Sequence, residues 1–284
     1  MTKYTRFTPG PHGELLNTLI RTKLSQNLAR LVPQLKGELD YFVATEFPEC
    51  KDWTPVKIQP LALRAIARLS GHAFVGSALN RSEAWMDTSI NFAIHVFIAV
   101  VKLQFFPAWL RPLGQYLVSD LAKIRRDIAQ AQAMLQPIIE ERLRDMECGG
   151  YDDSDRPDDF IQWLLEGLPE DKRTDFLAQT ELQLILSAAS IHTTSNLAVD
   201  CLYDLAAHPE VQEELRQEAL EVLEHDGGWA RKESIPRLKK MDSFMKEVQR
   251  LAGNVSKSKL FSLLFPISPS LSRLCVSVSE SYAL

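Results

Sequence analysis

Residues 180–207, TELQLILSAASIHTTSNLAVDCLYDLAA, combine a nearly continuous apolar pattern with a polar cluster at their centre. The apolar side chains of residues 182–191 cover almost every direction around a helical wheel, which predicts a helix buried on most sides. The cluster consists of Ser190, His192, Thr193, Thr194 and Ser195. Because a buried polar group without a partner costs about 1–3 kcal/mol, the sequence indicates either local hydrogen bonds or a helix that lines a cavity.

The overall composition is typical of a globular protein and gives no sign of nucleic-acid binding. The 284 residues are 45% hydrophobic and 24% charged, with a net charge of −5 and no basic block. This charge pattern argues against nucleic acid as the main partner. The length suffices for one large domain or two small ones.

The cysteines and histidines show no spacing that is typical of metal ligands. The four cysteines lie far apart, without a C-x-x-C pair, and no histidine stands near them at zinc-ligand spacing. The sequence also lacks three other motifs, namely H-E-x-x-H, a G-x-S-x-G elbow and a phosphate-binding glycine loop. We therefore expect separate reduced thiols, no metal-ligand residues, and neither hydrolase nor nucleotide chemistry.

Apolar spacing predicts a chain that is mainly α-helical with little β structure. Ser82 is expected to cap a helix, Gly76 to end one, and Pro137 to bend one. Residues 51–60, where apolar and polar side chains alternate, are the best strand candidate. Besides the central helix, which should end at the His208-Pro209 pair, helices are expected over residues 14–35, 34–47, 61–74, 82–103, 115–145, 160–167, 211–225 and 236–251.

Two segments outside the helical pattern bear on domain organisation and location. Residues 253–284 are rich in serine and hold neither a helical period nor a strand alternation, so we expect a helical core over residues 1–252 and an irregular tail. The most apolar window, residues 90–110, is interrupted by polar residues and a proline. A bilayer span needs about 20 apolar residues, so a buried or membrane-surface helix is the better interpretation.

The central helix carries Ala189-Ser190-Ile191-His192-Thr193-Thr194, which resembles the oxygen-groove motif of the cytochrome P-450 superfamily, the haem-thiolate monooxygenases. Ser190 stands where that family usually has glycine, and His192 stands where it usually has an acid. The His-Thr-Thr form is similar to that of fungal members. The motif therefore predicts membership of this superfamily, in a fungal-type branch.

Three other segments extend the resemblance from about the first helix to Leu251. Phe74–Trp85 is similar to the SARVFVG-like stretch of fungal members, and the helix around Arg21 resembles the region that approaches a haem propionate. Glu247 and Arg250 match the E-x-x-R helix of the family, at a spacing that places both on one helix face. The resemblance covers most of this chain and the middle of the family's domain.

The resemblance implies a partial cytochrome P-450-like helical fold and a set of site residues. The implied catalytic residues are Thr193, His192 and Thr194, the cofactor-binding residues are Ala189, Ser190 and Arg21, and the structural pair is Glu247 and Arg250. From the residues alone, two alternatives remain: Thr193 bonding back to the Ala189 carbonyl and a purely structural His192.

The resemblance also implies a reaction and its participants. It implies oxidation of a small hydrophobic molecule, such as a fungal terpenoid or alkaloid, by a haem enzyme that receives electrons from NADPH through a separate cytochrome P-450 reductase. The family resides at the endoplasmic reticulum membrane. Because no membrane anchor is recognised at the start of this chain, we expect a cytoplasmic or peripheral protein.

The sequence around the last cysteine leads us to expect a truncated chain that is inactive as given. The family binds haem iron through a cysteine in a loop of the form F-x-x-G-x-x-x-C-x-G. Around Cys275 the corresponding positions are Ser268, Leu271 and Ser277. The alternative is a non-catalytic helical protein that binds a hydrophobic ligand or partner.

Overall fold

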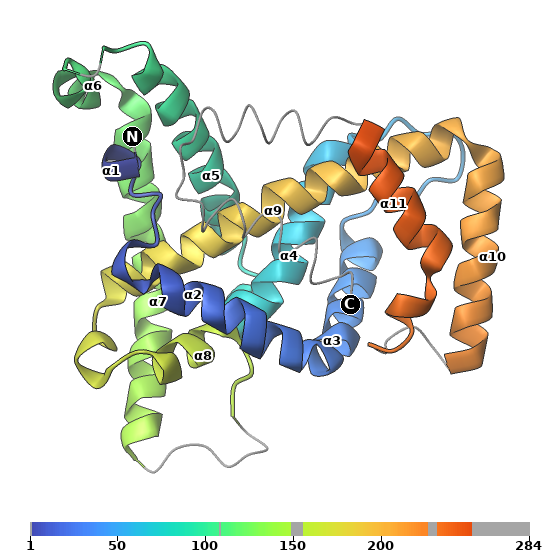
Figure 1. Ribbon diagram of the computed structural model, residues 1–284, viewed down its shortest axis with the longest axis horizontal. Helices are drawn as coiled ribbons and strands as arrows, with labels where there is room; N and C mark the ends of the chain where they lie inside the picture. The colour runs from blue at the N-terminus through green and yellow to red at the C-terminus, as the bar shows by residue number, and fades with distance from the viewer. Residues whose placement is uncertain (1, 108, 149–155, 227–231, 252–284) are drawn as a thin grey trace. The chain divides into compact units, whose positions relative to one another are not determined.

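The computed structural model describes residues 2–107, 109–148, 156–226 and 232–251, and this part of the chain is helical without a strand (Figure 1). The prediction of a mainly α-helical fold is confirmed. The predicted strand at residues 51–60 is wrong, because residues 47–55 are exposed on all sides and Ile58 already begins a helix. Side-chain alternation produces a strand only where one face is buried and a neighbouring strand pairs with it. The predicted tail, residues 253–284, lies outside the described residues.

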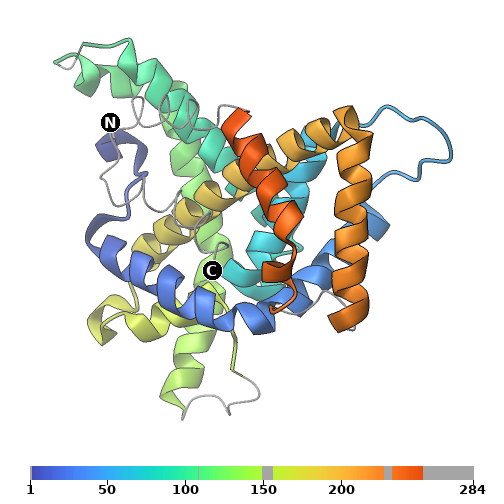
Figure 2. The same cartoon turned by 45° about the vertical axis from the view of Figure 1, so that its right-hand side comes forward.

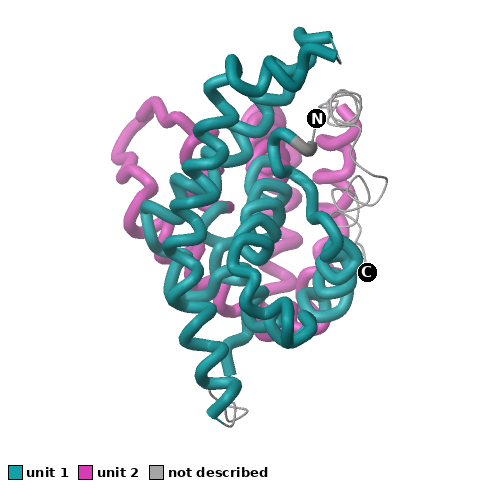
Figure 3. Tube along the Cα trace, turned by 90° about the vertical axis from the view of Figure 1, so that its left-hand side faces the viewer, with its two compact units in different colours: residues 1–25, 67–192 teal, residues 26–66, 193–284 magenta. Residues whose placement is uncertain are grey.

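The chain divides into two compact units, residues 1–25 with 67–192 and residues 26–66 with 193–284 (Figure 3). In the first unit, α5 (Glu83–Gln104) packs along α7 (Ser119–Glu147). The unit also contains most of α4 (Ile58–Leu79), the first half of α9 (Phe176–Ala207), and the elements α1 (Thr2–Thr5), η1 (Gly10–His12), α2 (Gly13–Leu19), the π-helical η2 (Ile20–Leu24), α6 (Arg111–Leu117), α8 (Phe160–Gly167) and η3 (Glu170–Lys172).

The second unit contains α3 (Ser25–Thr45), the second half of α9, α10 (Pro209–Asp226), η4 (Ile235–Arg237) and α11 (Lys239–Leu251). Helices α10 and α11 lie side by side (Figure 1, Figure 2). Glu218 on α10 accepts hydrogen bonds from the backbone N–H groups of Lys240, at 2.8 Å, and Met241, at 3.0 Å. A carboxylate at a helix N-terminus satisfies unpaired N–H groups and interacts favourably with the helix dipole.

Helix α5 shows why the most apolar window of the sequence does not have to be a membrane segment. It is the one described helix that is long and apolar enough to cross a membrane, with a mean hydropathy of 1.5. One face of it is nevertheless buried, with Trp85 1% and Phe92 0% exposed, whereas Ile94 and Phe97 on the other face are 38% and 42% exposed. As predicted, Ser82 caps it, because its hydroxyl oxygen accepts from the Trp85 backbone N–H at 3.4 Å. In this unit one face of α5 packs into the core.

Several helix boundaries differ from the predictions, and each difference has a local cause. Residues 13–45 are continuously helical, so the predicted break near residue 34 is wrong and Pro33 lies inside α3. The predicted helix over residues 115–145 is divided, because Val118 adopts an extended conformation between α6 and α7. Helix 160–167 has the predicted bounds.

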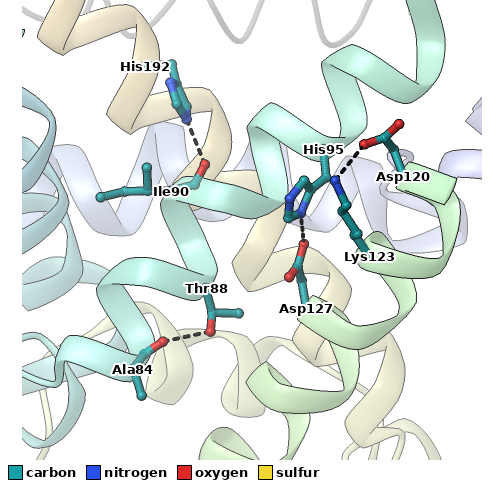
Figure 4. Close-up of polar contacts among 8 residues, drawn as sticks. All are labelled: Ala84, Thr88, Ile90, His95, Asp120, Lys123, Asp127 and His192. Carbon is teal, nitrogen blue, oxygen red and sulfur yellow. Dashed lines mark hydrogen bonds and ion pairs between the residues drawn. The ribbon is translucent and has the colours of Figure 1, made fainter. Parts of the chain in front are cut away.

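Polar contacts between α5 and α7 supplement their apolar packing (Figure 4). Asp127 Oδ2 lies 2.6 Å from His95 Nδ1. Asp120 on α7 accepts from Lys102 Nζ on α5 at 2.5 Å and, within α7, from Lys123 Nζ at 3.2 Å. Burial acts to raise the pKa of Asp120, but the hydrogen bonds and positive charges of the two lysines outweigh it and hold that pKa below its usual value.

Candidate functional site

Helix α9 buries its first half and exposes part of the polar cluster that follows. All residues from 182 to 188 are buried, which confirms the prediction for this half. Within the cluster Ser195 is fully buried, His192 and Thr194 are half-buried, and Thr193 is exposed. Consecutive residues of a helix point in different directions. The cluster is therefore divided between the interior and an accessible face.

His192 is held by a hydrogen bond to a helix that is distant in the sequence. Its Nε2 donates to the backbone carbonyl of Ile90 on α5 at 3.1 Å, across a sequence separation of 102 residues (Figure 4). Because a carbonyl only accepts, Nε2 carries the proton, and the neutral ring keeps its lone pair on Nδ1. Burial lowers the pKa of His192, and the bond to Ile90 opposes this only in part. The imidazole is therefore neutral near pH 7.

This lowered pKa predicts a pH dependence of stability. Below about pH 6.5, the usual histidine pKa, the unfolded chain takes up a proton at His192 that the folded chain binds less readily, so stability falls as the pH falls. His192→Gln, whose amide can still donate to the Ile90 carbonyl, should reduce the loss of unfolding free energy between pH 7.5 and pH 5.5. Urea titrations of wild type and His192→Gln at both pH values measure this loss of unfolding free energy. An equal loss in the two proteins would contradict the prediction.

The remaining site residues of the sequence prediction lie in different surroundings. Ala189 and Ser190 are half-buried on α9, one turn before Thr193. Arg21 is exposed in the π-helical segment η2. The motif thus places its own members together on one helix, while a role for Arg21 beside them stays a prediction.

Glu247 and Arg250 form the ion pair that their spacing predicts. Arg250 donates to Glu247 through Nε, at 2.7 Å, and through Nη2, at 2.5 Å. The side chains are 53% and 66% exposed. The hydrogen bonds and charge of Arg250 lower the pKa of Glu247. The pair therefore has the geometry of a solvated surface pair in this part of the chain, and a bracing role stays a prediction.

Glu247→Ala is expected to change the unfolding free energy of this chain little, because water screens an exposed ion pair. The measurement is a urea titration followed by circular dichroism. Lys246→Ala, which removes the similarly exposed pair of Lys246 with Asp242 on the same helix, is the matched control. A loss far above that of the control would show that the pair braces a core.

Three of the four cysteines lie in the described part of the chain, and their surroundings differ. Burial first, and then the charges of Asp200 and Asp204, raise the pKa of Cys201 to about 11. This thiol is therefore protonated at neutral pH. Cys50 and Cys148 are free and exposed, and the described residues contain no group of three or more metal-ligating side chains. Cys275 lies outside the described residues.

Comparison with known proteins decides the family. The family model for cytochrome P-450 matches residues 3–258. The chain belongs to the cytochrome P-450 family. It is 37% identical over 241 residues to the cytochrome P-450 monooxygenase AN1598 of Emericella nidulans, covering 84% of this chain and 44% of that protein.

Two further fungal relatives are similar to this cytochrome P-450 chain to the same degree. It is 36% identical over 252 residues to the cytochrome P-450 monooxygenase olcJ of Penicillium canescens, covering 88% of this chain and 47% of that protein. It is 36% identical over 240 residues to the cytochrome P-450 monooxygenase braC of Annulohypoxylon truncatum, covering 84% of this chain and 47% of that protein. The chain thus spans about half the length of the curated relatives it matches.

Sequence reasoning overlooked several buried polar residues. It placed the polar centre of α9 at residues 190–195, whereas Gln183 and Ser187 are more deeply buried than most of that cluster. It also gave no role to Arg142 or Asp159, which form a buried ion pair. Gln183 and Ser187 each stand inside an apolar stretch, a pattern that by itself does not name a partner, whereas Arg142 and Asp159 stand among other charged residues.

Proposed function

We propose that this chain is the helical part of a cytochrome P-450 monooxygenase that carries the oxygen-groove motif. The full-length enzyme would oxidise a small hydrophobic molecule, such as a fungal secondary metabolite. The observation that carries the proposal is the motif Ala189–Thr194, which runs from half-buried to exposed positions on α9, with its histidine held by the Ile90 carbonyl. Haem, with electrons from NADPH through a separate cytochrome P-450 reductase, belongs to this proposal for the full-length enzyme.

Each motif residue has a role in the proposal that its position supports. Thr193 lies on the exposed side of α9, where its hydroxyl, together with Thr194, would position a proton in the full-length enzyme. His192 orients α9 against α5 through Ile90, which favours a positioning role over proton relay. Ala189 and Ser190 have small side chains, which let a flat ligand approach the helix backbone closely. Arg21 would pair with a carboxylate of the cofactor.

The chain as given is not expected to sustain the reaction. The cysteine loop of the family is not matched around Cys275. Oxidation would need the thiolate, which favours cleavage of the O–O bond.

Haemin binding and an optical spectrum test these statements separately. The purified chain is titrated with haemin, followed by tryptophan quenching, and is then reduced and exposed to carbon monoxide. We expect haemin binding that Arg21→Ala weakens, without the red-shifted Soret band of a thiolate-bound haem. Binding unaffected by Arg21→Ala would remove the role of Arg21. A red-shifted band that persists in the Cys201→Ser variant and is lost in Cys275→Ser would show that Cys275 is the ligand.

Peripheral membrane attachment is the location that the surface supports, in a family that is typically membrane-associated. Five large apolar side chains between residues 105 and 117 are exposed, and residues 104–118 contain no acid and one cation, Arg111. Tryptophan and tyrosine side chains favour the membrane interface, and a positive charge favours anionic lipid. The exposed side chains are Phe105 at 84%, Trp109 at 78%, Leu113 at 62%, Tyr116 at 80% and Leu117 at 74%.

Vesicle binding measures this attachment. Trp109→Ser combined with Leu117→Ser should weaken binding to vesicles of phosphatidylcholine and phosphatidylserine on the order of tenfold or more, since each removes an inserted apolar side chain. Trp53→Ser is the matched control, because Trp53 is 101% exposed in a loop outside the apolar surface. Equal weakening by control and double variant would contradict the proposal.

A further inference from the structure

A row of deeply buried polar side chains lies on α9, on the turns before the polar cluster. Gln179, Gln183 and Ser187 follow one another at intervals of four residues, so they stand on one face of the helix. Their exposed fractions are 1%, 1% and 2%. Gln179 Oε1, both amide atoms of Gln183 and Ser187 Oγ have no hydrogen-bond partner among the described residues. All three residues belong to the first unit.

Reorienting the glutamine amides does not remove these unpaired atoms. Gln179 Nε2 donates to the backbone carbonyl of Arg173 at 2.6 Å. An exchange of its amide oxygen and nitrogen would place two acceptors against each other and lose this bond. Gln183 lacks partners on both atoms, so its exchange changes nothing. The unpaired groups are therefore a property of the fold around α9.

Unpaired groups at this depth would strongly oppose folding. Leaving one buried donor or acceptor unpaired shifts the folding equilibrium against the native state by about 5-fold to about 150-fold. The row carries four such atoms on two turns of the same helix. Native proteins satisfy buried polar groups with protein atoms or with ordered water. A partner other than the described protein atoms is therefore required.

We propose that Gln179, Gln183 and Ser187 form a buried hydration site that binds ordered water. A buried water makes about three hydrogen bonds and both donates and accepts, which suits this row. The two glutamine oxygens accept, Gln183 Nε2 donates, and the Ser187 hydroxyl does either. All three side chains are neutral, so an ion would find no compensating charge in the row. The site precedes the motif residues, so it is independent of their proposed role.

Replacing Gln183 with methionine distinguishes a hydrated row from a dry one. The two side chains are similar in length, but methionine cannot hold the water in place. A hydrated row predicts an unfolding equilibrium constant that rises on the order of tenfold. A dry row predicts that the unfolding equilibrium constant falls instead, because the substitution then removes two unpaired atoms. Leu184→Met, a volume-conserving change on the same buried helix, corrects for repacking.

Magnetic relaxation dispersion of water oxygen-17 counts the long-lived internal waters directly. Gln183→Met combined with Ser187→Ala should reduce its amplitude by at least one water relative to wild type and to Leu184→Met. If the double variant does not fold, Ser187→Ala alone is measured in the same way. An unchanged amplitude in folded variants, or a more stable Gln183→Met protein, would overturn the proposal.

Discussion

Asp159→Ala is expected to lower the free energy of unfolding by about 3–5 kcal/mol, because it leaves a buried guanidinium without its carboxylate. Arg142 on α7 donates to Asp159 through Nη1, at 2.5 Å, and through Nη2, at 2.6 Å. The two side chains are 9% and 5% exposed. Asp159 also caps α8, since its Oδ1 accepts from the Gln162 backbone N–H at 3.0 Å. Loss of this cap adds about 1 kcal/mol.

Urea titration of the variant and two comparison proteins tests this prediction. Asp159→Asn retains an oxygen for the cap but loses the charge, so its effect should be large but smaller than that of alanine. Asp171→Ala removes an acid that is 72% exposed beside Lys172, and it should change stability little. If Asp159→Ala is no more harmful than Asp171→Ala, the buried pair does not stabilise the fold.

Gly76→Ala is expected to destabilise the chain by an amount comparable to Asp159→Ala, because Gly76 meets two constraints at once. Its φ of 70° and ψ of −179° interrupt α4, and this region of backbone space, essentially restricted to glycine, costs other residues about 1–3 kcal/mol. A Cβ atom at this position would lie 2.4 Å from Asp159 Oδ2 and 3.6 Å from Arg142 Nη2. The methyl group would therefore push the carboxylate away from its guanidinium partner.

Gly37→Ala is the control for the glycine substitution. Gly37 lies inside α3, and a Cβ there meets nothing within 4 Å. Alanine should therefore stabilise that helix by up to about 1 kcal/mol. Relative to wild type, we expect the unfolding free energy to fall in Gly76→Ala and to rise in Gly37→Ala. Equal effects would show that Gly76 has no special environment.

A double-mutant cycle connects the two predictions. The methyl group of Gly76→Ala collides with the Asp159 side chain, so the collision disappears when residue 159 is alanine. The combined loss of stability should therefore be smaller than the sum of the single losses, as expected for residues in contact. Strict additivity would indicate that backbone conformation alone explains the requirement for glycine.

Local sequence patterns were sufficient for most of the helices. Apolar periodicity, the Ser82 cap and the His208-Pro209 pair act within a few residues, and the structure has helices where they predict them. The same kind of reasoning failed at residues 51–60, because a strand requires a partner that local alternation does not provide. It also failed near Pro33, where α3 continues with Leu31 and Phe42 buried on either side of the proline.

The sequence by itself determined the family, the helical class and the single helix that carries the motif Ala189–Thr194, because periodicity and motif spacing are local properties of the chain. Only the tertiary structure decided which atoms these residues meet. The bond from His192 to Ile90 and the cluster of Gly76 with Asp159 join segments far apart in the sequence. Such contacts depend on how helices pack, because burial and the need to pair buried polar groups are satisfied only by the folded chain as a whole.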